Sequence, residues 1–418
     1  MKKQYIISER AHFMCPNMHF GILAEIRKPY NHEKLYAALN SLAEAHPFLR
    51  SVIESANDGK KLCYDVSDKL KITVCEKQTQ DSMWNDYIEI GKNDWNVFEN
   101  GLLKVYIYPN TEGFQALFIA HHLLCDGRGL LELVCEFSDI YVKDIKPGCV
   151  EENLILSMDD LPEGSNLPSF SKWLIQRVNK KWIKENKRVS YDTYAEFAQH
   201  FAKDNPVGYA YASLDKPGVE NMWKQCRENS VSVNDLLMAR LYTAANTRKI
   251  IIAVDIRDKL SRYNKGAMGN YASAMGIVYE KSGDDAFETA KKLHCLVKQH
   301  ISDNRKLMLV LACYLSMNAE LIDAAAISAL GGFESKAAKF AGGTMFGFAK
   351  RNGISLTNLG SVSSDTLHSA MFIPPASPAT IQTVGALTVN GVMKLCSSYY
   401  TNVVDIAVIK NRLQYMIR

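Results

Sequence analysis

Long apolar runs are missing from this sequence of 418 residues. The longest candidate, residues 307–315, has the length of a buried helix, whereas a membrane span needs about 18 or more apolar residues. A secretory signal is missing too, because Glu9 and Arg10 interrupt the stretch after the two N-terminal lysines. We therefore expect no transmembrane segment and a cytoplasmic location.

Metal-ligand and disulfide spacings are also missing. No two of the ten cysteines are spaced CxxC, and the sequence has no HExxH motif and no Cys/His cluster. These absences favour reduced, mostly buried thiols and argue against a zinc site. The formal net charge is only +4 and no run of Lys and Arg forms a stripe, so we expect no nucleic-acid partner.

A mixture of strand and helix patterns fills the first part of the chain. Asn31 suits the N-cap of a helix whose apolar face includes Leu35, Leu39 and Leu42, and Pro47 ends that helix. A second helix begins after residue 127. Strands are predicted at residues 5–7, 21–26, 49–54, 62–66, 102–108 and 115–120, with Asn57-Asp58-Gly59 as a hairpin turn.

The second part of the chain resumes after an irregular stretch rich in Pro and Gly. Strands are predicted at residues 208–214, 250–254, 354–357, 385–388 and 405–409, and helices from Ser232 and over 286–301. These patterns indicate a mixed α/β (α+β) protein with two lobes. We place the N-terminal lobe at residues 1–165, a crossover at 166–190 and the C-terminal lobe at 191–418.

Two segments have more than one interpretation. The basic stretch WLIQRVNKKWIKENKR is either a solvated helix face, which we favour, or a surface for an acidic partner. Residues 307–348 are apolar and rich in Gly and Ala. They either pack as helices, which we favour, or shape an acyl pocket.

The stretch HHLLCDG, residues 121–127, is the most informative part of the sequence. It lies where a buried strand gives way to a helix, a junction that places side chains and free N–H groups at a sheet edge. Neighbouring strand residues point to opposite faces, so one histidine serves the fold while the other points into a cavity. A general base needs a partner that holds one tautomer; Asp126 either supplies it or fixes the loop. Gly127 allows close approach of a substrate to the backbone.

Rival uses of this stretch are weaker. A single histidine at a strand end is more often a core residue, but two histidines followed by Asp-Gly at this spacing favour function. Adjacent histidines point apart, which argues against a metal site. Cys125 follows an apolar pair, so it more often faces a core than acts as a nucleophile.

Several motifs resemble one superfamily in the same order along residues 5–410. HHLLCDG matches HHxxxDG of nonribosomal peptide condensation domains, alcohol acyltransferases and BAHD acyltransferases, which fold like chloramphenicol acetyltransferase. LYAALNSLAEAHPFLR, with His46, Pro47, Leu49 and Arg50, resembles the first long helix of these proteins. The other similar segments are SVSVNDLLMARLYTA, VDIRDKL followed by MGNYAS, and LTNLG.

The resemblance implies two chloramphenicol acetyltransferase-like lobes, each a mixed sheet flanked by helices, with a tunnel between them. It implies that His122 is catalytic, that His121 is structural, and that Asp126 pairs with Arg257 to pin the loop. Gly127 would offer its N–H to an oxyanion. Asn270 and Asn358 match positions that line the tunnel or hold strands. Arg128 is less expected after the motif and is left out of the site.

The implied reaction is acyl transfer from a thioester to a hydroxyl or amine, with His122 as general base. We favour acyl-CoA as donor, with no bound cofactor and no metal. A phosphopantetheinyl thioester on an acyl or peptidyl carrier protein is the alternative donor. A non-catalytic docking module of an assembly line is the other class, against which the intact His122, Asp126 and Arg257 argue.

Overall fold

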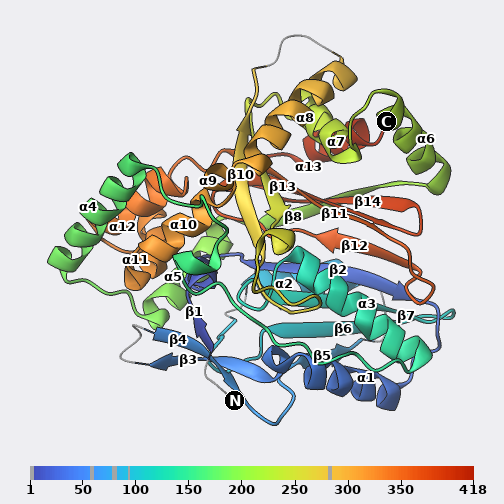
Figure 1. Ribbon diagram of the computed structural model, residues 1–418. Coiled ribbons are helices and arrows are strands. Elements are labelled where there is room, and N and C mark those ends of the chain that lie inside the picture. The colour runs from blue at the N-terminus through green and yellow to red at the C-terminus, as the bar shows by residue number, and fades with distance from the viewer. Residues whose placement is uncertain (1–3, 57–60, 78–81, 93–94, 281–284) are drawn as a thin grey trace.

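Two mixed β-sheets, one below the other in Figure 1, form the body of the protein. The structure is a computed structural model that describes residues 4–56, 61–77, 82–92, 95–280 and 285–418. A small third sheet, β1–β4–β3, packs beside the first. The predicted α/β fold of two lobes, each with a mixed sheet flanked by helices, is confirmed.

The first sheet has the strand order β12–β2–β7–β6–β5. Its strands are β12 (Ser369–Ile373), β2 (His19–Ile26), β7 (Phe114–His121), β6 (Leu103–Pro109) and β5 (Thr73–Glu76). All neighbours are antiparallel except β5 and β6. The edge strand β12 comes from the C-terminal half of the chain, so the two halves are interleaved at this edge.

Helices α1 (His32–Ala45) and α3 (Gly127–Lys143) pack against the first sheet. Asn31 caps α1, since its side chain accepts a hydrogen bond from the Lys34 N–H. Leu35, Leu39 and Leu42 are fully buried, as their helical spacing predicts. The chain then turns through η2 (Pro47–Arg50), so the strand predicted from residue 49 begins later.

The small sheet consists of β1 (Gln4–Ile6), β4 (Lys61–Val66) and β3 (Ser51–Ala56), and η1 (Ser8–His12) follows β1. The antiparallel pairing of β3 with β4 confirms the two strands of the predicted hairpin. Its turn, Asn57-Asp58-Gly59, lies outside the described residues. Helix α2 (Met83–Lys92) precedes β6.

The second sheet has the order β10–β9–β11–β13–β14–β8. Its strands are β10 (Ala272–Val278), β9 (Lys249–Asp255), β11 (Gly353–Val362), β13 (Thr380–Val389), β14 (Val392–Tyr400) and β8 (Val207–Leu214). The central β9–β11–β13 pairings are parallel and the others antiparallel. Every strand predicted in this half lies within one of these, apart from residues 405–409.

Helices α6 (Lys216–Glu228), α7 (Val233–Ala245), α8 (Ala286–Ser302) and α13 (Ile406–Met416) cover one face of the second sheet (Figure 1). The strand predicted at residues 405–409 is therefore wrong. Asp405 is an N-cap that accepts from the Ala407 N–H, and Ile409, Leu413 and Met416 recur at helical spacing on the buried face.

A third group of helices lies beside both sheets, to the left in Figure 1. It contains α4 (Ser169–Glu185), α5 (Tyr191–Asp204), α9 (Asn304–Leu307), α10 (Leu309–Ser316), α11 (Ala319–Ala329) and α12 (Lys336–Phe340). The short turns η4 (Met158–Asp160), η5 (Arg257–Lys259) and η6 (Ala341–Met345) complete the fold. Among the described residues no single helix is long and apolar enough to cross a membrane. In the same described part of the chain, one bent pair of helices, α10 and α11 at 113°, passes by length and composition.

Candidate active site

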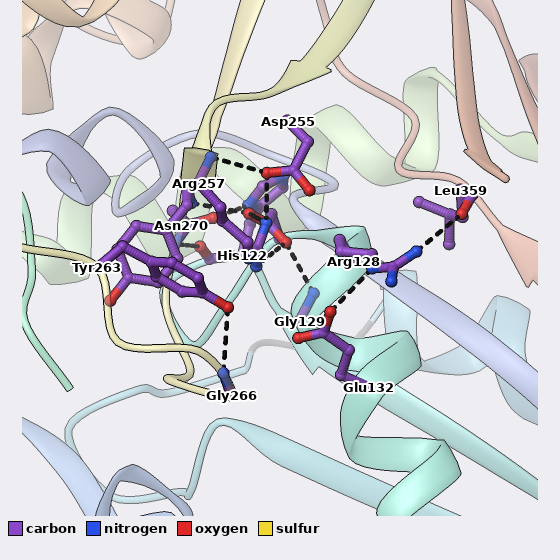
Figure 2. Close-up of polar contacts among 12 residues, drawn as sticks. His122, Arg128, Gly129, Glu132, Asp255, Arg257, Tyr263, Gly266, Asn270 and Leu359 are labelled. Carbon is purple, nitrogen blue, oxygen red and sulfur yellow. Dashed lines mark hydrogen bonds and ion pairs between the residues drawn. The ribbon is translucent and has the colours of Figure 1, made fainter. Parts of the chain in front are cut away.

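His122 lies between the end of β7 and the start of α3, where the motif was expected. Its backbone N–H donates to the carbonyl of Met18, which leads into β2, and its side chain is half-buried. Figure 2 shows that His122, Asn270 and Arg257 converge from separate segments of the chain. The ring is thus fixed in a loop that is still open to solvent.

Asn270 holds both the ring and the backbone of His122. Its side-chain N–H₂ donates to the His122 carbonyl at 2.9 Å, and its Oδ1 lies 2.9 Å from the ring Nδ1. Because an amide oxygen only accepts, Nδ1 of His122 must carry the proton. The other ring nitrogen, Nε2, is therefore unprotonated and able to act as a base.

Two rings pack against His122. His12, the last residue of η1, stacks on it with ring centroids 4.1 Å apart and an interplanar angle of 16°. Phe20 of β2 meets the ring edge-on at 5.0 Å. No motif in the sequence pointed to His12, whose position depends on how η1 folds against the first sheet.

Burial keeps both stacked histidines neutral. It lowers the pKa of His122 below its ordinary value of 6.5, although the Asp126 charge and the Asn270 hydrogen bond oppose that shift. Burial also lowers the pKa of His12 well below 6.5, and the neighbouring His122 and His121 add to this effect. His122 is thus in its basic form at neutral pH.

Asp126 is bound to Arg257 rather than to His122. Arg257 donates to both carboxylate oxygens, Nη2 to Oδ1 at 2.9 Å and Nη1 to Oδ2 at 3.0 Å, and both side chains are buried. Asp126 is also the N-cap of α3, because its side chain accepts a hydrogen bond from the Gly129 N–H. It accepts a further hydrogen bond from the Tyr271 N–H. Arg257 in turn binds Asp255 at 3.1 Å. The carboxylate therefore ties the motif loop to η5, through Arg257, and to Tyr271, which precedes β10.

His121, the other histidine of the motif, has different partners from those of His122. Its ring meets Trp95 edge-on at 5.7 Å, and its Nδ1 accepts from the Leu123 N–H. Burial and the neighbouring His19, His122 and Lys104 lower the pKa of His121 to about 3. The ring is thus a neutral part of the fold, beside a cavity of about 60 Å³ that it helps to line.

Gly127 is the first residue of α3, where N–H groups have no acceptor within the helix. A Cβ atom there would lie 3.0 Å from Leu359 Cδ2 and 3.3 Å from Phe372 Cζ, so a side chain would crowd residues of β11 and β12. The helix N-terminus, with its partial positive charge, thus lies next to the motif loop.

Asn358 does not meet His122 through any hydrogen bond among the described residues. Its Oδ1 accepts from the Gly360 N–H at 2.9 Å, within an irregular part of β11 where Gly360 has a φ of +84°. Arg128, left out of the expected site, pairs with Glu132 and donates to the Leu359 carbonyl at 3.4 Å (Figure 2). These contacts join α3 to β11.

A nucleophilic role for Cys125 does not fit the structure. Its side chain is fully buried, and burial together with the Asp126 charge raises the pKa of its thiol well above the ordinary value. Among the described residues, no group of three or more His, Cys, Asp or Glu side chains is placed to hold a metal ion.

A second buried ion pair joins distant parts of the chain. Arg10 of η1 donates to both oxygens of Asp323 in α11, at 2.7 and 2.6 Å. Both side chains are buried, so the pair fixes η1 against α11. Because η1 ends at His12, this ion pair also fixes the position of the His12 ring, which stacks on His122.

Comparisons with known proteins relate the chain to others through its structure. A scan of family models gave no match, and neither did a search of curated proteins. The TRI3 trichothecene 15-O-acetyltransferase from Fusarium sporotrichioides matches with a TM-score of 0.65 and 12% identity, over 99% of this chain and 94% of that one. Polyketide synthase associated protein 5 from Mycobacterium tuberculosis matches with a TM-score of 0.61 and 15% identity, over 100% and 96%. The first condensation domain of the CDA synthetase gives 0.61 and 11%, over 99% and 95%.

The chain therefore has the two-lobed fold of the superfamily that contains condensation domains and chloramphenicol acetyltransferase-like acyltransferases, as its motifs predicted. The identities are low, so the likeness is one of fold. An epimerization domain of tyrocidine synthetase has this fold as well, with a TM-score of 0.56 and 15% identity. The fold alone therefore does not define the reaction.

Proposed function

We propose that this protein is an acyltransferase that moves an acyl group from a thioester to a hydroxyl or amine acceptor, with His122 as general base. The observation that carries the proposal is the tautomer of His122. Asn270 keeps the proton on Nδ1, which leaves Nε2 as a base in a half-buried loop at the N-terminus of α3. The pKa of His122, lowered by burial, keeps that base unprotonated at pH 7.

One proton moves in the proposed reaction, from the acceptor to His122 and then to the leaving thiolate. Nε2 of His122 takes the proton of the acceptor O–H or N–H as the acceptor oxygen or nitrogen attacks the thioester carbonyl. The oxyanion that forms is stabilised by the N-terminus of α3, and the Gly127 N–H is the donor we assign to it. When the carbon–sulfur bond breaks, protonated His122 returns the proton to the leaving thiolate. No acyl-enzyme intermediate is needed.

The buried pair of Asp126 and Arg257 supports this step from outside the reaction centre. It fixes the loop that carries His122 and Gly127, while Asn270 sits one residue before Tyr271, whose N–H binds the same carboxylate. A base held in this way loses little orientational freedom in the transition state. We favour acyl-CoA over a carrier-bound donor.

Thiol release measured with a thiol-reactive dye tests the proposal. A panel of acyl-CoAs would be offered with pooled alcohols and amines to the wild type, His122→Ala and His200→Ala, which removes an exposed histidine on α5 as a control. Removal of the base should lower turnover by about 10²- to 10⁴-fold while the melting temperature stays close to that of the wild type. Equal turnover of folded His122→Ala and wild type would refute the assignment. If none of the proteins releases thiol from an acyl-CoA, but the wild type transfers an acyl group from an acylated carrier protein, CoA is excluded as the donor.

A further inference from the structure

A large cavity lies at the N-terminal ends of β9 and β11, whereas the C-terminal end of β9 leads to Arg257 of the candidate site. Its volume is about 1340 Å³, and it is lined by α4, α12 with η6, and the first residues of β9 and β11. The two segments with open interpretations, the basic stretch around α4 and the Gly/Ala-rich segment 307–348, both contribute to its walls.

The cavity is strongly basic. Its lining contains seven Lys and Arg residues and no Asp or Glu. All seven are exposed, and among the described residues none of them forms an ion pair. A concave wall that carries only positive charges concentrates anions. The seven residues are Arg177, Lys181, Arg248, Lys249, Lys336, Lys339 and Lys350.

Aromatic rings accompany the cations. On α4, Trp173, Arg177 and Lys181 follow one another at four-residue spacing, so they share one helix face. The Arg177 guanidinium lies 5.4 Å from the centroid of the Trp173 ring, which is 50% exposed. Phe340 of α12 is another exposed ring in the lining. Such a wall offers stacking surface for a purine together with donors for phosphates.

A strip on one face of β9 and β10, with small residues at its middle, leads from this cavity toward the motif loop. Lys249 and Ile251 of β9 line the cavity, and Ala253 and Asp255 continue on the same face of the strand, both exposed. Ile250 and Ile252 point the other way, into the core with α7 and α8. At about 3.3 Å per residue, the six steps from Lys249 to Asp255 span about 20 Å.

The neighbouring strand continues the strip. Ala274 of β10 pairs with Ala253, Gly276 pairs with Ile251, and both are exposed. The strip ends at Asp255, which binds Arg257, and Arg257 holds the loop of His122 through Asp126. A ligand with an anionic, aromatic head and a long, thin arm fits this combination of cavity and strip.

We propose that the basic cavity binds the adenosine 3′,5′-bisphosphate end of an acyl-CoA donor and that the pantetheine arm lies along the strip toward His122. The inference rests on the proposed function and names its donor. CoA carries a purine, a 3′-phosphate and a 5′-diphosphate, which match exposed rings and several cations. A carrier protein presents one phosphodiester at a convex surface, which matches neither the concave shape nor the rings.

Calorimetric titration of the full-length protein with CoA, dephospho-CoA and adenosine 3′,5′-bisphosphate tests this assignment. Two double variants remove cations from different walls: Arg177→Gln with Lys181→Gln, and Lys336→Gln with Lys339→Gln. Lys180→Gln with Lys184→Gln is the matched control, because both residues are exposed on α4 outside the cavity lining. Each cavity variant should weaken CoA and adenosine 3′,5′-bisphosphate by about 10- to 100-fold, and the control should not.

Dephospho-CoA should bind more weakly than CoA to the wild type and lose less in the cavity variants. Unchanged CoA affinity in both cavity variants would overturn the proposal. A second outcome would also overturn it: CoA does not bind the wild type, and the cavity variants lose acyl transfer from an acylated carrier protein. In that case the basic cavity would be a binding surface for a carrier protein.

Binding is read without turnover, so the two proposals fail separately. His122→Ala should bind CoA like the wild type. A protein that binds CoA through the cavity but releases no thiol would contradict the acyltransferase function alone. An active enzyme that depends on His122, but whose KM for acyl-CoA is the same in both cavity variants, would contradict the cavity alone.

Discussion

The side-chain amide of Asn270 grips His122 at two points, donating to its backbone carbonyl and accepting from its ring Nδ1, each at 2.9 Å. The first bond fixes which end of the amide faces the ring, and the second then fixes the ring proton. Asn270 comes from the Gly-Asn-Tyr segment before β10, whereas His122 follows β7. The tautomer of the proposed base is thus set across the two halves of the chain.

Substitution of Asn270 should alter the pH dependence of catalysis. In the wild type, burial lowers the pKa of His122 below its ordinary value of 6.5, so kcat/KM should rise with pH through an acidic limb displaced to the acid side of a free histidine. In Asn270→Asp, a carboxylate next to Nδ1 favours the imidazolium and raises that pKa, so the acidic limb should move to higher pH. Asn270→Ala should lower kcat by about 10- to 100-fold, because the ring loses its orientation. Profiles of kcat/KM between pH 5 and 9 measure both effects, and an acidic limb that stays in place in Asn270→Asp would contradict this role.

Loss of Arg257 should destabilise the protein as well as slow it. In Arg257→Ala, the buried Asp126 keeps its two backbone donors but loses both guanidinium bonds, which should cost roughly 3–5 kcal/mol of unfolding free energy. Denaturant titration monitored by circular dichroism measures the change. Arg27→Ala is a suitable control, because the ion pairs of the exposed Arg27 side chain with Glu25 and Glu112 are long, at 3.8 and 3.5 Å, and their loss should cost less than about 1 kcal/mol. Equal stability of Arg257→Ala and the wild type would speak against the pair as the anchor of the loop.

The sequence identified the motif loop because its residues are adjacent in the chain. The partners of these residues were harder to find. Asn270 was predicted only as a tunnel or strand residue, and its bonds to His122 depend on a loop–loop contact across 148 positions. His12 carried no signal at all, since a stacked ring requires η1, β2 and β7 to be placed first. Patterns in one sequence report periodicity, whereas this contact is set by tertiary packing.

The fold shows the same division between local and long-range information. The strands β6 and β7 were predicted at residues 102–108 and 115–120, and their antiparallel pairing is local in the sequence. The edge strand β12 was missed, since it joins a sheet whose other strands lie far away in the sequence. At residues 405–409 the β-branched side chains favoured a strand, but the cap at Asp405 and the buried face of α13 made a helix. Tertiary burial decided that segment.

The ring of His12 should contribute to catalysis by packing against His122 rather than by donating a proton. Its pKa is lowered well below 6.5, so it is neutral beside His122 and has no proton to give at pH 7. His12→Phe keeps a stacked ring and should retain most of the turnover. His12→Ala uncovers one face of His122 and should lower kcat by about 2- to 10-fold, the worth of one aromatic pair. Steady-state kinetics with both variants decide between the roles, because a proton-transfer role would make His12→Phe as slow as His12→Ala.

His46 should make the stability of the fold depend on pH above neutrality. Its buried ring lies between Glu136, 2.8 Å from Nε2, and Glu152, 3.4 Å from Nδ1, and so joins the end of α1 to α3. Burial alone would lower the pKa of His46, but the hydrogen bonds and charges of the two carboxylates outweigh it and raise the pKa to about 9.

Because the folded pKa lies above the unfolded value of about 6.5, the stabilisation is fully present below pH 6.5 and is lost as pH rises through 9. The unfolding free energy should therefore fall by on the order of 2 kcal/mol between pH 6.5 and 9. His46→Gln keeps a polar side chain but does not titrate, so its stability should change far less over this interval. His200→Gln, at an exposed position, should keep the slope of the wild type. Denaturant titrations at pH 6, 7.5 and 9 measure the slopes, and parallel slopes for His46→Gln and the wild type would show that another group carries the pH dependence.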